Sequence, residues 1–189
     1  IVGGLSNTFG GEADYGFVGG GAYNSGSGAG SGLVAGRSNS VEGADSFLGA
    51  GRKNTVSSSY AALVGGMSNS ISGSYSFIGG GALNNLTSTA NYSVVAGGSD
   101  NDIANANYVT IAGGQDNSVS ANYGMIPGGR SNEVTATYGF AAGRRAKANH
   151  TGAFVWADST DADFTTTTAD SFNIRASGGM NVDVSGQGT

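Results

Sequence analysis

The chain has 189 residues, enough for one domain, and its lack of cysteine excludes a disulfide framework. A net charge of −5 excludes the basic composition typical of nucleic-acid-binding proteins, and no apolar run is long enough to span a membrane. Glycine accounts for 36 residues, and the stretch from Asn54 to Ser99 carries no charged side chain. Disordered chains usually depend on charge to stay solvated, so we expect regular structure instead.

From Ile1 to about Asn149 the chain consists of ten similar units with a period of fifteen residues, stretched to sixteen or seventeen in places. Each unit has an apolar residue, a glycine three positions later and an asparagine three positions after that glycine. Only the tenth unit differs, with Ala146 in place of the asparagine. The nine asparagines are Asn7, Asn24, Asn39, Asn54, Asn69, Asn84, Asn101, Asn117 and Asn132.

This period predicts an all-β fold in which each unit forms one coil of a β-solenoid, with two strands of about five residues joined by tight turns. Apolar residues such as Ile78 would point inward, with glycine or alanine where backbones approach closely. The asparagines would stack into a hydrogen-bonded amide ladder and would adopt the left-handed conformation of the turn. We therefore interpret both residue types as structural, since the motifs of phosphate-binding loops and calcium-binding repeats are incomplete.

A single coil of this size buries few apolar side chains. The free energy of burying them does not obviously offset the backbone entropy lost when fifteen residues become ordered. We therefore predict that other copies of the chain supply a second buried face, which makes the protein a homo-oligomer.

Three units show a family resemblance: "SFIGGGALNN" (76–85), "TIAGGQDNSVSANY" (110–123) and "MIPGGRSNEVTATY" (125–138). They resemble the head repeats of YadA-like trimeric autotransporter adhesins, although the family's unit is shorter and the triple glycine is heavier here. The resemblance implies a left-handed parallel β-roll with three chains around one axis, over residues 1–149. The segment 141–164 resembles the end cap that follows such repeats in bacterial and phage fibre proteins. Residues 150–189 are therefore predicted to form a β cap or a junction to a further fibre segment.

The fifteen-residue period is lost from Thr151 onward, where residues 153–157, 171–176 and 180–184 are predicted strands. Phe154 and Trp156 would give one strand an aromatic face that closes the open end of the solenoid. A ligand-stacking role for Trp156 is the alternative interpretation.

A group of bases precedes a group of acids in this segment. Ion pairs between neighbouring chains would fix the junction; the alternatives are solvated charges, or a cation site, although the spacing lacks the remaining oxygen ligands. The residues are Arg144, Arg145, Lys147, Asp158, Asp161 and Asp163.

Tyrosine closes most of the coils. Stacked above one another, these rings would form a stripe, either as structural packing at a coil corner or as a sugar-binding surface. The tyrosines are Tyr15, Tyr60, Tyr75, Tyr92, Tyr108, Tyr123 and Tyr138. The surface contacts we name from this set are Tyr60, Tyr75, Tyr108, Tyr123 and Tyr138.

These features favour a non-enzymatic, extracellular fibre module or adhesin head, acting as a homotrimer on a bacterial surface. It would attach to a host receptor, a matrix protein or a glycan, or act as a rigid shaft that presents a receptor-binding tip. The alternative is a segment of a bacteriophage tail fibre or tail spike on the virion that binds polysaccharide. A depolymerase would need paired acidic residues, and the coils from Asn54 to Ser99 have none.

No catalytic, cofactor-binding or metal-binding residue is predicted, and neither are nucleic-acid partners or membrane insertion. We interpret His150, the single histidine, as a turn residue because no nucleophile motif accompanies it. We also interpret the chain as an internal piece of a longer protein, since Ile1 opens directly into the repeat.

Overall fold

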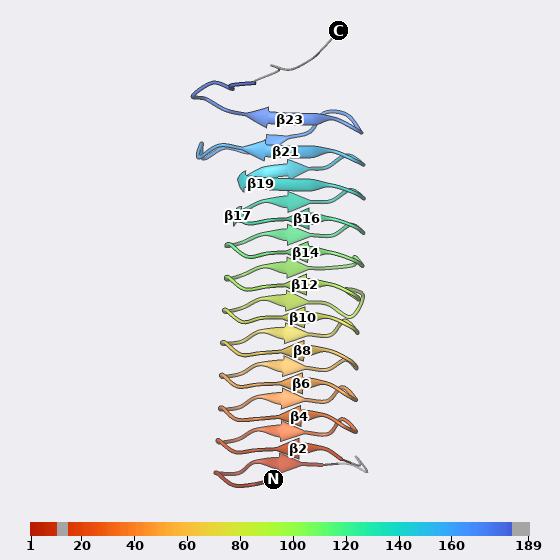
Figure 1. The fold of residues 1–189 in the computed structure, drawn as a ribbon, viewed down its shortest axis with the longest axis vertical. Helices are drawn as coiled ribbons and strands as arrows, with labels where there is room; N and C mark the ends of the chain where they lie inside the picture. The colour runs from red at the N-terminus through yellow and green to blue at the C-terminus, as the bar shows by residue number, and fades with distance from the viewer. Residues whose placement is uncertain (11–14, 183–189) are drawn as a thin grey trace, which may run out of the picture.

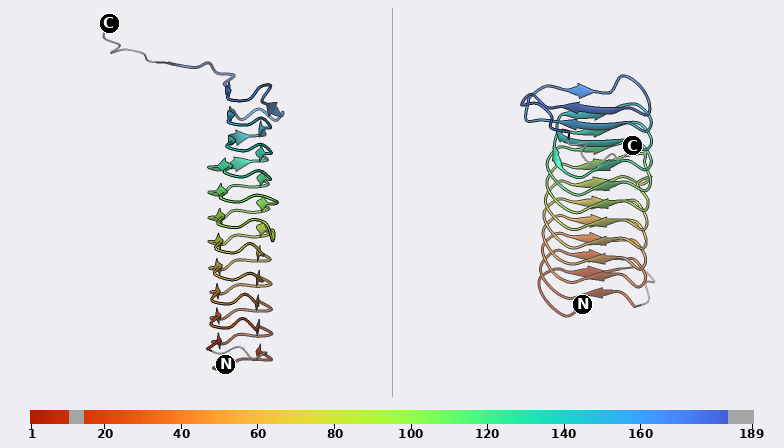
Figure 2. Two further views of the ribbon diagram at one scale, coloured as in Figure 1. Left: turned by 90° about the vertical axis from the view of Figure 1, so that its right-hand side faces the viewer. Right: turned by 45° about the horizontal axis from the view of Figure 1, so that its top comes forward.

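The computed structural model describes residues 1–10 and 15–182, which form a parallel β-solenoid of about 11 turns with no helix. In Figure 1 the coils stack from the N-terminus at the bottom to the C-terminus at the top. Figure 2 shows the strands as two facing columns, one for each sheet. The predicted all-β solenoid is thus confirmed. Within the described residues, no helix long and apolar enough to cross a membrane is present.

Every strand pairs in parallel with the matching strand of the next coil, so each sheet runs the length of the solenoid. Sheet A contains twelve strands on its main path and branch: β2 (Phe17–Val18), β4 (Gly32–Leu33), β6 (Phe47–Leu48), β8 (Ala62–Leu63), β10 (Phe77–Ile78), β12 (Val94–Val95), β14 (Thr110–Ile111), β16 (Met125–Ile126), β19 (Phe140–Arg144), β21 (Phe154–Ala157) and β23 (Phe172–Arg175), with β17 (Gly129–Arg130) paired to β19. Sheet B contains eleven: β1 (Thr8–Phe9), β3 (Ser25–Gly26), β5 (Ser40–Val41), β7 (Thr55–Val56), β9 (Ser70–Ile71), β11 (Asn85–Leu86), β13 (Asp102–Ile103), β15 (Ser118–Val119), β18 (Glu133–Val134), β20 (Ala146–Ala148) and β22 (Phe164–Thr165).

Most strands have two residues, shorter than the five that we predicted. Glycine-rich turns flank them, so each strand contributes one outward and one inward side chain before the chain bends. Turn 1 links a sheet A strand to the next sheet B strand, and turn 2 links sheet B back to sheet A. Parallel bridges also connect successive coils along turn 1, for example Arg37 with Arg52 and Met67 with Ala82.

The core is a double column of aliphatic side chains, one from each sheet. The second residue of the two-residue sheet A strands other than β17 is buried, as in Leu63 and Ile78, and so is that of the sheet B strands from β3 to β18, as in Ile71. In β3 this buried residue is Gly26, which has no side chain, and the Phe9 ring lies so close to it that a Cβ would overlap the ring. A large neighbour therefore fills the gap in the one unit whose sheet B position is not apolar.

The last glycine of turn 1 has a conformation that other residues rarely adopt. Gly66 has φ of +98°, and a Cβ there would overlap the carbonyl oxygen of Gly81 in the next coil. The left-handed residue in the same turn is not the asparagine, as we predicted, but the residue before it: Ser68, with φ of 57°, precedes Asn69. The asparagine side chain is thereby left free to bond along the stack.

The solenoid continues past the end of the sequence repeat. Strands β21 and β23 extend sheet A with Phe140, Phe154 and Phe172 in register, and β22 extends sheet B. The strands predicted at 153–157 and 171–176 are present, and inserted loop residues lengthen these coils. The prediction at 180–184 is wrong for residues 180–182, which form no strand; residues 183 and 184 lie outside the described residues.

Candidate functional site

The repeated asparagines form a continuous ladder inside turn 1. Each backbone N–H, from Asn24 on, donates to the Oδ1 of the asparagine one coil earlier, at 3.0–3.3 Å. Each Nδ2 donates to the carbonyl four residues earlier, at 2.8–3.2 Å. It also donates to a turn 1 glycine one coil later, at 2.9–3.2 Å. Each asparagine side chain therefore provides a partner for one backbone N–H and two backbone carbonyls at turn 1.

Ala146, which replaces the asparagine of the tenth unit, ends this ladder. Its backbone N–H donates to Asn132 Oδ1 at 3.0 Å, so the last amide oxygen is still used. Among the described residues, no buried side-chain nitrogen or oxygen lacks a hydrogen-bond partner. Because the asparagine side chains bond to other groups of the same chain, we interpret the ladder as structural.

A second, shorter amide ladder lies in turn 2, and the sequence interpretation missed it. Asn91, Asn107 and Asn122 each accept a hydrogen bond from the backbone N–H at the equivalent position one coil earlier, at 2.8–3.2 Å. The signal was available, because Asn91, Asn107 and Asn122 each directly precede a tyrosine.

Six tyrosines of turn 2 form an uninterrupted stack. Neighbouring ring centroids are 4.9–5.2 Å apart and the planes differ by 3–12°. Tyr15 is not among the stacked rings, and the equivalent positions of the next two coils hold Gly30 and Asp45, both with positive φ. The stacked residues are Tyr60, Tyr75, Tyr92, Tyr108, Tyr123 and Tyr138.

The stacking decides which parts of the tyrosines remain accessible. Each ring is about half exposed, but every inner ring has a neighbour on both faces. A sugar packs against the face of an aromatic ring, and only Tyr60 and Tyr138 at the two ends have one face without a stacked tyrosine. The stripe therefore presents ring edges and hydroxyl groups along its length.

We expected these charged residues to pair between neighbouring chains, but in the structure they pair within one chain, between successive coils. Arg144 Nη2 lies 2.7 Å from Asp161 Oδ2, and Arg145 Nε lies 2.8 Å from Asp163 Oδ1. The hydrogen bond from Arg145 lowers the pKa of Asp163 below its usual range, and Asp163 in turn raises the pKa of Arg145. These pairs fix the lengthened loop of 158–163 against the coil below it.

Two of the candidate residues have other partners than we expected. Lys147 Nζ lies 3.2 Å from Glu133 on the neighbouring strand of sheet B, and Asp158 pairs with Arg175 at 3.0 Å. The backbone N–H groups of Ser177 and Thr160 also donate to Asp158 and lower its pKa well below its usual range. Asp158 thus anchors the loop and the end of β23.

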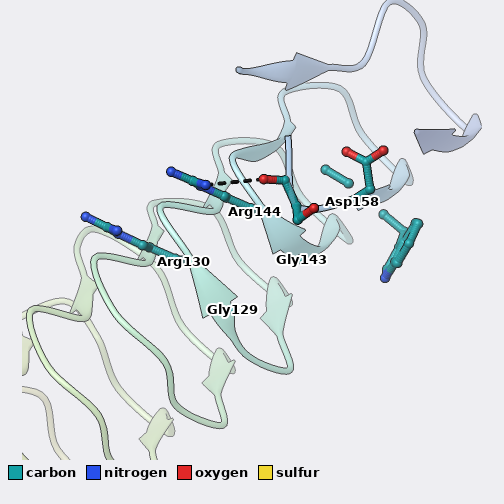
Figure 3. Close-up of a pocket in the computed structure, with 8 residues that line it drawn as sticks. Gly129, Arg130, Gly143, Arg144 and Asp158 are labelled. Atoms are coloured by element: carbon teal, nitrogen blue, oxygen red, sulfur yellow. Dashed lines mark hydrogen bonds between the residues drawn. The ribbon is translucent and has the colours of Figure 1, made fainter. Parts of the chain in front are cut away.

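An open cavity of about 570 Å³ lies beside these ion pairs. Figure 3 shows Arg130 and Arg144 extending in parallel from successive coils, above Gly129 and Gly143. Trp156, 40% exposed, contributes an apolar wall on the outward side of sheet A. Asp158 and Ser159 complete the lining, so the cavity combines cations with an aromatic surface.

The outward faces of the two sheets differ completely in chemistry. On sheet B the outward residue of every strand is polar: it is the first residue in the strands from β1 to β18, Lys147 in β20 and Thr165 in β22. On sheet A the outward positions of the main-path strands are apolar except for Thr110, and the branch strand β17 ends in the exposed Arg130. The sheet A outer face comprises Phe17, Gly19, Gly32, Val34, Phe47, Gly49, Ala62, Val64, Phe77, Gly79, Val94, Ala96, Thr110, Ala112, Met125, Pro127, Phe140, Ala142, Phe154, Trp156, Phe172 and Ile174.

Large and small residues alternate within several coils on the sheet A outer face. The rings of Phe47 and Phe77 lie over the glycines two positions later, Gly49 and Gly79. In the coil between them the order is reversed, with Ala62 followed by Val64, which is 50% exposed. The result is a continuous, mainly apolar surface that runs the length of the solenoid.

No protein-family model matches this chain, and a search of the curated proteins finds no significant relative.

Proposed function

We propose that this chain is a non-enzymatic module of an extracellular homotrimeric fibre or adhesin head. It attaches to a receptor, matrix protein or glycan on a host surface, or holds a receptor-binding tip away from its base. The same module would serve in a bacterial surface adhesin or in a bacteriophage tail fibre. The observation that carries the proposal is the sheet A outer face, which is apolar from Phe17 to Ile174 while sheet B is polar.

A continuous apolar surface of this length marks an interaction site in a soluble protein. A partner must match it along the whole axis, and a second copy of the chain has the same apolar face with the same coil spacing. Mutual burial of sheet A would remove exposed side chains such as Phe47 and Val64 from water. Three copies around an axis, as the resemblance of the repeats implies, would bury sheet A and leave sheet B outward.

The coil architecture suits a mechanical role. Two sheets, two amide ladders and a tyrosine stack all run parallel to the axis, so each coil is bonded to its neighbours at several points around its perimeter. A rod built in this way transmits load along its length and presents a chosen end at a distance from the base.

Two matched substitutions in one coil test the proposal. Val64→Glu places a charge on sheet A and would have to be buried on association, which costs several kcal/mol. Ser57→Glu adds the same charge on the outward side of sheet B. We expect Val64→Glu to dissociate the trimer and Ser57→Glu to leave it intact, as measured by multi-angle light scattering. Equal behaviour of the two variants would contradict the assignment of the interface.

A further inference from the structure

Three cationic side chains gather on turn 1 of two successive coils. Arg37 and Arg52 are directly paired by a parallel bridge, and the Lys53 N–H donates to the Arg37 carbonyl at 3.0 Å. With Ser38 they line a cavity of about 230 Å³. All four residues are exposed, on an edge that belongs to neither sheet. This cationic cluster is therefore accessible on the surface of the chain.

The cluster lacks a counter-charge among the described residues. No carboxylate there lies within ion-pair distance of Arg37, Arg52 or Lys53, whereas the four cations from Arg144 to Arg175 are all paired. Like charges on directly opposed residues of a sheet repel one another. A chain of net charge −5 nevertheless places three of its eight cations here. An anionic ligand would relieve that repulsion.

The donors indicate which anion fits. A carboxylate has two oxygens, and one guanidinium satisfies both. Two guanidinium groups, one ammonium and the Ser38 hydroxyl are better matched by a group with three free oxygens around a tetrahedral centre. The Arg37 guanidinium also lies 6.0 Å from the centroid of the Tyr23 ring, which limits its orientation.

We propose that Arg37, Ser38, Arg52 and Lys53 form a binding site for a sulfate or phosphate monoester carried by a polysaccharide. The anion chemistry rests on the cluster alone, while the choice of a polysaccharide as its carrier rests on the proposed role in surface attachment. A homotrimer would present three such sites at one level of the fibre and so gain avidity for a polymer.

Dextran polymers that differ only in their charged group distinguish a sulfate or phosphate ester from a carboxylate as the ligand. Dextran sulfate, dextran phosphate, carboxymethyl dextran of equal charge density and unmodified dextran are each immobilised for surface plasmon resonance with the whole chain. We expect binding to at least one of the first two polymers and at least ten-fold weaker binding to carboxymethyl dextran. Whichever of dextran sulfate and dextran phosphate binds more tightly identifies the ester. Binding should weaken as salt rises, because exposed charges are screened.

Arg130 supplies a matched control, since it occupies the same turn 1 position several coils away and is also exposed. Arg52→Gln should weaken binding at least ten-fold, and Arg130→Gln should change it less than two-fold. Equal losses in the two variants, equal binding of carboxymethyl dextran, or binding to none of the charged polymers would each overturn the site.

Light scattering on the same samples keeps the two proposals distinguishable. If Arg52→Gln dissociates the assembly, the cluster pairs with a neighbouring copy and the ligand site is overturned. If the wild-type chain is monomeric but still binds the sulfated or phosphorylated polymer, the ligand site stands and the trimer does not.

Discussion

The repeat region and the last coils use the same two sheets but are held together by different interactions. From Asn54 to Ser99 no charge is present, and amide ladders, stacked tyrosines and backbone hydrogen bonds join the coils. Beyond Gly143 the asparagine ladder has ended, and ion pairs and a phenylalanine stack take its place. Coils of equal length bring identical side chains into register, so these side chains can stack. Coils of unequal length are instead joined by ion pairs between individual residues.

The largest expected effect is on the turn 1 glycines that every repeat shares. Gly66→Ala would force a Cβ onto the Gly81 carbonyl at a positive φ, and we expect a loss of roughly 2–5 kcal/mol in unfolding free energy. The adjacent Gly65→Ala is the control, because a Cβ there would make ordinary contacts. Denaturant unfolding measures both, and similar losses in the two variants would show that close backbone approach is not the cause.

Removing one rung of the asparagine ladder should be the next largest effect. Asn69→Leu leaves the Asn84 N–H and the Gly81 carbonyl without their amide partners, which costs on the order of 1–3 kcal/mol per chain. Thermal unfolding measures this loss. An unchanged melting temperature would mean that the ladder does not stabilise the fold.

Lowering the pH should destabilise the last coils before it destabilises the repeat region. The pKa values of Asp158 and Asp163 are lowered in the folded state, so their stabilisation is present above the unfolded pKa of about 4 and is lost as pH falls. Between pH 5 and pH 2 we expect β21 and β23 to lose hydrogen-exchange protection before β8 and β10, after correction for intrinsic rates. Equal loss in both regions would contradict a charge-held C-terminal part.

The tyrosine stack should have the smallest effect on stability. Tyr92→Ser removes a ring that is stacked on both sides, and because the rings are half exposed each pair contributes about 0.5 kcal/mol. We expect a small shift in melting temperature and a reduced near-ultraviolet circular dichroism signal, with the assembly intact. Dissociation of the assembly would mean that the stack is part of a chain interface.

Features that recur at fixed spacing could be predicted from the sequence. The solenoid, the inward positions such as Ile78 and the stacking of Asn69 on its neighbours follow from the period. The left-handed residue was assigned one position too late, because spacing does not report backbone dihedrals and both Ser68 and Asn69 are polar.

The candidate surfaces were harder to predict. The sheet A outer face can be recognised only when the outward side chains of the two sheets are compared. In one coil, for example, the outward Val64 on sheet A is apolar and the outward Ser57 on sheet B is polar. The accessibility of the tyrosine faces depends on side-chain rotation, which no periodicity reports. The partners of Lys147 and Asp158, which are Glu133 and Arg175, depend on loop lengths that depart from the period, so both partners lie outside the two groups of charged residues named from the sequence.

The central claim is that copies of this chain associate through the sheet A outer face. The most direct test is the mass of the wild-type protein by sedimentation equilibrium. We predict a single species with three times the 18.5 kDa mass of the chain, unchanged on dilution through the micromolar range. A folded, stable species of one chain mass would contradict the claim.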